Sequence, residues 1–365
     1  MLRLAEAVLD GHPDKFCDIL ADRVLAAGYA ADPACYGQIE VGCWADAIWF
    51  SGAILSRTPM RETLAEIVHC LGQEIGAGSE GAADARRYRI QNEICFVRGD
   101  PRPYNAIVDD QCIVMGWAGY DASTHYLPPE HFLAHTFRQA LIDACRVGPL
   151  HGRGPDGKLL LRLCEEGKRW LLEQVVVTLQ HGPTETLVEL AQAVSQTLAT
   201  VYARLRAADR RWNRPWQDVE LLVNPGGPLI RAGSDGDNGQ TGRKLVMDYY
   251  GPRLAIGGGA LSGKHLAHID RIAAYAARHA AVAAVVTGAS ACQITLAYAP
   301  GGDEPLDVLY DMDGRGRVLP KASLRHSAMV RRYGRGVDIG RLGRGTHFYD
   351  LGLPWNKAPS ADMLY

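Results

Sequence analysis

The stretch G-S-D-G-D-N-G-Q-T-G-R-K-L-V-M-D-Y-Y-G-P-R-L-A-I-G-G-G-A-L-S-G-K-H-L-A-H-I-D-R runs from Gly233 to Arg271, and the rest of the chain is organised around it. It places Arg243, Lys244 and Lys264 among nine glycines. Glycine has no side chain to keep an anion away, so backbone N–H groups can approach it closely. The stretch therefore predicts a site for a polyphosphate.

The second half of this stretch has the spacing of a phosphate-binding P-loop, with Gly258, Gly263 and Lys264 in register. A P-loop continues with Ser or Thr, whose hydroxyl holds magnesium, whereas this chain continues with His265. The P-loop interpretation is therefore weak, and the phosphate site must be of another kind.

The length and charge of the chain limit its class. A chain of 365 residues predicts two or three domains with ample core. A net charge of -2 argues against a nucleic acid or an anionic membrane as the main partner, because either requires a broad basic surface. Any anion that the protein binds should be small.

The cysteines and the N-terminus indicate a cytoplasmic location. The nine cysteines are scattered without a C-x-x-C pair, which predicts reduced thiols and neither a disulfide framework nor a zinc site. Residues Met1 to Glu6 lack the apolar region of a targeting signal, and Arg278 and His279 interrupt the alanine-rich run after Arg271. We expect no membrane-spanning segment.

A helix is predicted to begin in the segment G-H-P-D-K, residues Gly11 to Lys15, because Pro13 suits a first helical position. From spacing alone, Asp14 could simply cap the helix beside a solvated His12, or both could be functional. The other expected elements are paired strands over 36–54, an exposed loop over 97–103, helices over 128–146, 185–206 and 272–286, a turn over 154–158, and strands over 175–181, 219–223 and 293–299.

The chain resembles the S-adenosylmethionine synthetases, also called methionine adenosyltransferases. In that family G-D-x-G-x-T-G-R-K and G-G-G-A-F-S-G-K-D frame the triphosphate of ATP, and both motifs occur in the correct order within Gly233 to Arg271. The N-terminal G-H-P-D-K is a third family motif, and the family's V-V-x-S-T-Q-H and G-H-F-G-R are echoed at 175–181 and 347–350. The resemblance covers essentially the whole chain.

The resemblance implies a role for individual residues. Those implied to bind ATP are His12, Asp156, Lys158, Leu229, Asp237, Arg243, Lys244, Ala260 and Lys264. Among them, His12, Lys158, Arg243 and Lys264 would act in catalysis by stabilising the departing tripolyphosphate. Asp14 and Asp270 would hold Mg²⁺. Those that match the acceptor pocket are Trp49, Gln91, Asp110, Asp237 and His268.

The implied reaction is adenosyl transfer from ATP to the sulfur of methionine or a methionine-like thioether, followed by hydrolysis of the tripolyphosphate to phosphate and pyrophosphate. A thioether carries no proton to lose, which fits the absence of an obvious nucleophile-and-base pair in the sequence. The alternative is a non-catalytic nucleotide-binding paralogue that regulates a true synthetase. Retention of every leaving-group contact favours the enzyme.

The departures from the family pattern gather in the acceptor pocket. Trp49 replaces an acid that binds the amino group of methionine, and His268 replaces a lysine. Tyr36 replaces the acid that binds a monovalent cation, which puts a K⁺ requirement in doubt.

Two further segments differ from or match the family. Near the lid that the family places over the active site, the residues Asp109-Asp110-Gln111 stand where the family has G-D-Q, so Asp110 matches the family's acid. Leu229 replaces an aromatic residue that stacks on adenine.

These departures leave alternatives open. Glu40 or Asp46 could replace the lost acids if the strand register shifts, or Trp44, Trp49 and Phe50 could simply pack a core. His268 could be a weaker cation for the same carboxylate, a surface histidine, or a sign that the acceptor has changed.

The resemblance also implies the fold and the assembly. We expect an α+β fold of three similar sheet-and-helix units with pseudo-threefold symmetry. The approximate and interleaved units are 1–112, 113–232 and the signature-bearing 233–365. A homodimer or dimer of dimers with shared active sites is expected.

Overall fold

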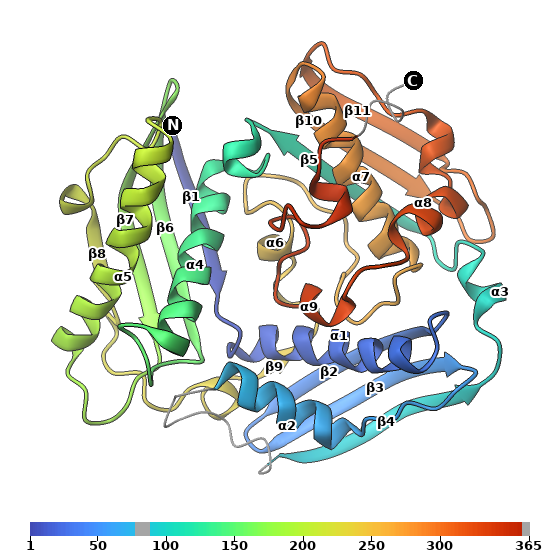
Figure 1. Ribbon diagram of the computed structural model, residues 1–365, viewed down its shortest axis with the longest axis horizontal. Coiled ribbons are helices and arrows are strands. Elements are labelled where there is room, and N and C mark those ends of the chain that lie inside the picture. The colour runs from blue at the N-terminus through green and yellow to red at the C-terminus, as the bar shows by residue number, and fades with distance from the viewer. Residues whose placement is uncertain (77–87, 360–365) are drawn as a thin grey trace.

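A computed structural model describes residues 1–76 and 88–359, which form a mixed α+β fold with three separate sheets (Figure 1). In the view of Figure 1 the sheets lie at the left, at the bottom and at the upper right. The longest buried helices are α1 (Pro13–Ala31), α4 (Pro129–Val147) and α7 (Ile269–Val286). The predicted α+β class is confirmed.

The sheet at the left joins the N-terminal strand to strands from the middle of the chain. Its order is β1-β6-β7-β8, with bounds β1 (Leu2–Val8), β6 (Gly157–Glu166), β7 (Arg169–Leu179) and β8 (Glu220–Val223). Helices α4 and α5 (Leu187–Ala208) pack on it. Because β1 and β6 are antiparallel, Val8 lies opposite Lys158, and the chain leaves β1 for Gly11 and His12 close to the start of β6.

The sheet at the bottom ties the glycine-rich stretch to the N-terminal region. Its order is β4-β3-β2-β9, with bounds β2 (Tyr36–Trp44), β3 (Ala47–Ser56), β4 (Arg89–Arg98) and β9 (Gly239–Gln240). Helices α1 and α2 (Leu64–Ile75) cover its inner face (Figure 1). Strand β9 pairs with Gly42 and Cys43 of β2, so residues far apart in sequence meet here.

The third sheet has the order β11-β10-β5, with bounds β5 (Cys112–Gly119), β10 (Ala289–Tyr298) and β11 (Asp307–Gly314). The alanine-rich α7 lies against it, and α8 (His326–Tyr333) packs on α7. The helix and β5 approach so closely that a Cβ at Gly116 would lie 2.1 Å from the carbonyl carbon of Ala277. Glycine at 116 therefore lets the helix lie close to β5, and residues 269–284 of α7 are buried.

Several predicted boundaries differ from the structure: β7 begins at Arg169 and β10 at Ala289, whereas these strands were predicted from residues 175 and 293. Helix α7 begins at Ile269 and not at residue 272, because His268 caps it. The exposed loop predicted over 97–103 is shorter, since β4 continues to Arg98 and the short helix α3 (Arg102–Asn105) follows. The other short helices are α6 (Leu245–Asp248) and α9 (Ile339–Leu342). In the described ranges we find no helix with the length and apolar character to cross a membrane.

The tryptophans of the second sheet do not all pack a core. Phe50 is fully buried, but Trp44 is 51% exposed and Trp49 is 40% exposed. Trp49 lies opposite Gly42 in a regular β2–β3 register, so the register does not shift. Of the two acids considered as replacements, Glu40 shares the outer face of β2 with Gly42, whereas Asp46 is paired with Arg89 at 2.9 Å.

Candidate active site

The N-terminus of α1 forms the first part of the site. His12 is the N-cap residue, and its Nδ1 accepts a hydrogen bond from the Asp14 backbone N–H at 3.3 Å. The ring proton is therefore assigned to Nε2. Burial, followed by the nearby Lys244 ammonium, lowers the pKa of His12 to about 4. This lowered pKa favours the neutral imidazole, whose Nε2–H can donate a hydrogen bond to an anion.

Asp14 is 2% exposed, and its carboxylate is in contact with residues of the glycine-rich stretch Gly233 to Arg271, called the signature below. Its carboxylate pairs with the Lys244 ammonium, lies 3.5 Å from Arg243 Nη1, and accepts a hydrogen bond from Gln240 N–H at 3.0 Å. The structure thus brings the predicted magnesium ligand and two predicted phosphate cations together. One carboxylate thus lies between two cations, and this group of three side chains keeps a net positive charge.

The turn before β6 joins the start of the signature. Asp156 Oδ2 accepts a hydrogen bond from Gly233 N–H at 2.8 Å, and burial raises the pKa of Asp156 to about 6. Lys158 pairs with Glu6 at 2.6 Å in an exposed ion pair, and its ammonium is close enough to contribute to the lowered pKa of His12. Asp237 is exposed and caps its own loop through Asn238 N–H at 2.8 Å.

Lys264 and Asp270 form the second part of the site, at the N-terminus of α7. Their Nζ and Oδ2 atoms are 2.6 Å apart, and Lys264 forms a bridge with Gln38 of β2. Gly259 has to be glycine, because a Cβ there would lie 2.4 Å from Asp270 Cγ. Ala260 lies beside the first half of the signature, where a Cβ on Gly242 would meet its Cβ at 3.0 Å. The two halves of the signature are therefore in contact.

His268 is not a surface histidine, because it is only 5% exposed. Its Nδ1 accepts the Asp270 backbone N–H at 3.2 Å, so it caps α7. Burial lowers the pKa of His268 from its ordinary value. As a neutral imidazole it does not supply the permanent positive charge of a lysine.

The remaining predicted residues lie in three places. Trp49 and Gln91 are register partners on β3 and β4, on the exposed face of the sheet. Asp110 is exposed just before β5 and lies near His268 and Asp270. Leu229 is half-buried, and its carbonyl accepts a hydrogen bond from His181 N–H at 3.1 Å.

The sequence interpretation missed a cluster around Asp109. Asp109 Oδ2 lies 3.5 Å from Tyr36 Oη, 3.8 Å from His265 Nε2 and 4.0 Å from His268 Nε2. The Tyr36 and His265 rings are 4.2 Å apart. The available signal was that Asp109 and His265 stand where the family motifs have glycine and aspartate. An acid gained at 109 beside two histidines indicates a local reconstruction of this pocket.

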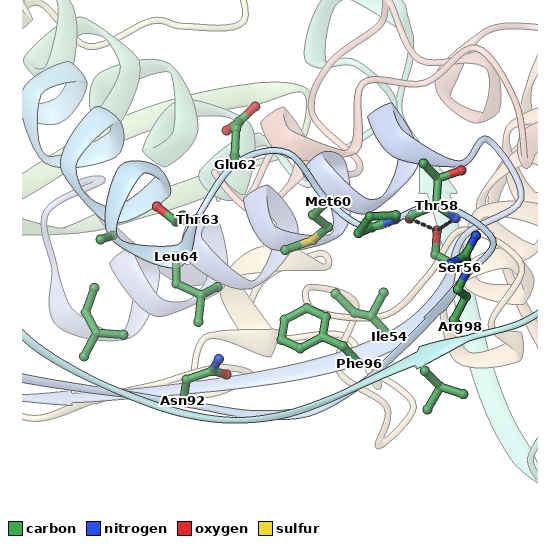
Figure 2. Close-up of a pocket in the computed structure, with 14 residues that line it drawn as sticks. Ile54, Ser56, Thr58, Met60, Glu62, Thr63, Leu64, Asn92, Phe96 and Arg98 are labelled. Atoms are coloured by element: carbon green, nitrogen blue, oxygen red, sulfur yellow. Dashed lines mark hydrogen bonds between the residues drawn. The ribbon is translucent and has the colours of Figure 1, made fainter.

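A separate apolar cavity of about 700 Å³ lies between α2 and the strands β3 and β4 (Figure 2). Figure 2 shows Met60, Leu64, Ile54 and Phe96 around it. None of the predicted site residues in the described chain lines it. Gln91 lies between two lining residues of β4, but successive strand residues face opposite sides of a sheet.

Comparison with known proteins gives a consistent result. Residues 231–332 match the family model described as S-adenosylmethionine synthetase, C-terminal domain. The S-adenosylmethionine synthase of Parvibaculum lavamentivorans is 30% identical over 99% of this chain and 96% of its own length. That of Trichormus variabilis is 29% identical over 99% of this chain and 95% of its own length. S-adenosylmethionine synthase 1 of Rhodopseudomonas palustris is 33% identical over 82% of this chain and 78% of its own length. The chain belongs to the S-adenosylmethionine synthetase family, as a divergent member.

Proposed function

We propose that this protein transfers the adenosyl group of ATP to the sulfur of methionine or a methionine-like thioether, and then hydrolyses the tripolyphosphate to phosphate and pyrophosphate. The observation that carries the proposal is the meeting of Arg243 and Lys244 with Asp14 at one helix N-terminus, and of Lys264 with Asp270 at another. Cations and oxygen ligands are thus gathered where a triphosphate and a metal would be bound.

In the proposed reaction the sulfur lone pair attacks C5′ of ATP, and the bond from C5′ to the phosphate oxygen breaks with its electron pair. The leaving tripolyphosphate gains negative charge, which Lys158, Arg243, Lys244 and Lys264 would stabilise. His12 would donate its Nε2–H to a phosphate oxygen, since Nδ1 is engaged in the helix cap. No side chain has to remove a proton from the acceptor.

The proposed magnesium ligands are Asp14 and Asp270, whose carboxylate oxygens are the donors that Mg²⁺ prefers. Bound Mg²⁺ would neutralise phosphate charge and orient the leaving group. The lysines that now hold these carboxylates would turn to the phosphates, so that nucleotide binding exchanges one set of ion pairs for another. This exchange keeps buried charges paired throughout.

The rest of the expected assembly is part of the same proposal. We propose three interleaved units near 1–112, 113–232 and 233–365, related by a pseudo-threefold axis, in a cytoplasmic homodimer or dimer of dimers with shared active sites. The exposed Trp44 and Trp49 on an open sheet face support an interface there. This chain has Tyr36 at the position where the family has a cation-binding acid, which supports a reaction that does not need K⁺.

The test is incubation of the full-length protein with ATP, Mg²⁺ and a panel of thioethers, with mass spectrometry of the products and assay of phosphate and pyrophosphate. Formation of a sulfonium product together with both phosphates supports the proposal. ATP binding without turnover on any thioether would instead favour the regulatory paralogue.

A further inference from the structure

A large polar cavity is lined by residues of α1, α4 and α9 and of the segment 336–354. Its volume is about 800 Å³. Five arginines line it, namely Arg23, Arg138, Arg146, Arg341 and Arg344. In the described chain, none of the residues predicted to bind ATP, the acceptor or a metal is among its lining residues. The cavity is therefore separate from the predicted active site.

Carboxylates and arginines are paired unequally along one wall of this cavity. Asp10 is 3% exposed, and its carboxylate pairs with both Arg138 and Arg344. Arg344 also pairs with Glu74 at 2.6 Å, and Glu74 pairs in turn with Arg23. Two carboxylates are thus shared by three guanidinium groups, which leaves one positive charge without a counter-charge.

Arg146, in the last turn of α4, adds a second positive charge to this wall. Its Nη2 atom is buried and has no hydrogen-bond partner within the part of the chain that the structure describes. Arg146 and Asp10 also line a second, much smaller cavity, so Arg146 lies close to the paired groups. Because buried donors in proteins are nearly always hydrogen-bonded, this guanidinium indicates a missing acceptor.

The remaining charged groups of the cavity are exposed. Asp338 and Asp350 accept hydrogen bonds from backbone N–H groups of their own turns, at 3.2 Å and 2.7 Å. Glu62 and Arg341 are also exposed. Water and salt screen exposed charges more strongly than buried ones. The two excess positive charges on the wall at Asp10 therefore determine which ligand the cavity attracts.

We propose that this cavity binds a small multivalent phosphate anion, with Arg146 as its main contact and with Arg138 and Arg344 adding positive charge. Guanidinium groups donate paired hydrogen bonds to phosphate oxygens, and two excess charges suit a multivalent anion better than a monocarboxylate. The cavity has the size of a small-molecule site, so pyrophosphate should fill it better than inorganic phosphate. Pyrophosphate is a product of the proposed reaction. That source of the ligand rests on the proposed function, but anion binding itself does not.

The test is isothermal titration of the full-length protein, free of nucleotide and metal, with pyrophosphate, inorganic phosphate and acetate. We expect pyrophosphate to bind most tightly and acetate not to compete with it. Arg146→Gln should weaken pyrophosphate binding in this cavity by at least about tenfold, because it removes a charge and a guanidinium donor. Its melting temperature without the anion should be unchanged, since Nη2 loses no partner within the protein.

Arg206→Gln is the matched control. Arg206 is likewise half-buried in the last turn of a helix, α5, but it does not line the cavity. Its Nε donates a hydrogen bond to the backbone oxygen of Trp212 at 3.3 Å. The pyrophosphate affinity of this variant should equal that of the unmodified protein.

The combined Arg243→Ala and Lys264→Ala variant separates this cavity from the predicted active site, which is also expected to bind phosphates. Pyrophosphate binding that persists in this variant and is weakened by a further Arg146→Gln supports the proposal. The proposal is overturned if no pyrophosphate binds to the combined variant at millimolar concentration, if Arg146→Gln leaves the affinity unchanged, or if Arg206→Gln weakens it equally. Because ATP and acceptor are absent, these outcomes are independent of whether the protein proves to be an adenosyltransferase.

Discussion

His12 and His268 cap α1 and α7 with the same backbone geometry, φ -59° and ψ 132° at both residues. Each ring accepts the N–H of an aspartate two residues on, at 3.3 Å for Asp14 and 3.2 Å for Asp270. Each aspartate in turn holds a lysine, Lys244 or Lys264. Two helix N-termini therefore present an acid and a cation in the same local arrangement, and both are predicted to bind the metal and phosphates of one substrate.

Replacing a phosphate cation should lower turnover more than ATP affinity. We expect Lys264→Ala and Arg243→Ala each to reduce kcat by about 10² to 10³, because their charge matters most as the leaving group becomes negative. Steady-state kinetics and nucleotide titration measure the two effects. Lys168→Ala, at an exposed lysine in the β6–β7 turn, is the control and should be unaffected. Near-normal turnover in both site variants would place the triphosphate elsewhere.

The two functions of His12 should be separable. His12→Ala removes the cap and should cost about 1 kcal/mol of unfolding free energy, whereas His12→Asn keeps a capping acceptor and should be nearly neutral. Both variants lose the Nε2–H donor, so we expect turnover to fall in both. Chemical denaturation and kinetics are the measurements. If turnover follows stability, with His12→Asn fully active, His12 serves only as a cap.

The raised pKa of Asp156 predicts a pH-dependent contribution to stability. The folded protein keeps the proton on Asp156 up to about pH 6, whereas the unfolded chain releases it near pH 4. Its favourable contribution is present below the unfolded pKa and is lost as pH rises to the folded value. Asp156→Asn should therefore gain stability relative to the unmodified protein as pH increases from about 4 to 6.

Thermal denaturation of both proteins across this pH range tests the Asp156 prediction. The comparison is made as a difference between them because other buried groups, including His12, also titrate there. A difference in melting temperature that does not change with pH would show that Asp156 ionises as an ordinary surface carboxyl.

Turnover should not require K⁺. Tyr36 provides a phenol where relatives have an acid, and its hydroxyl faces Asp109 at 3.5 Å while His265 lies against its ring. We expect less than about a twofold change in rate when KCl is replaced by tetramethylammonium chloride at equal ionic strength. A change of that size corresponds to less than about 0.5 kcal/mol in the activation free energy. A strong and saturable K⁺ activation would mean that another group binds the cation.

Methionine should be a poor acceptor. Trp49 cannot pair with an ammonium as an acid does, and neutral His268 offers no permanent charge to a carboxylate. Each lost hydrogen bond to a charged group costs roughly 1.5–3 kcal/mol, so kcat/KM should be low by several orders of magnitude unless new partners compensate. His268→Lys should improve kcat/KM for methionine, while His12→Lys should not. Saturation of the unmodified protein at micromolar methionine would contradict the altered pocket.

The sequence alone was sufficient to predict a polyphosphate site in Gly233 to Arg271, because the spacing of glycines and cations is a local property of the chain. Helical periodicity after Gly11 and apolar strand patterns likewise predicted α1, β2 and β3 closely, whereas β7 begins at Arg169 and not at residue 175. The start of α7 was misplaced because the cap is a histidine, which the usual capping preferences do not include. The buried position of His268 followed from that cap and from packing, which periodicity does not report.

By itself, then, the sequence determined the family and the α+β class, since each depends on residue type and order along the chain, and it predicted which cations would bind the triphosphate. Only the tertiary structure decided which charges meet. The pairing of β9 with β2 brings Lys244 to Asp14 across 230 positions of sequence. The packing of α7 brings His268 and Asp270 to Asp110. The pKa values of His12, Asp156 and His268 follow from burial in those contacts, because the cost of charging a group depends on the solvent that the fold removes from it.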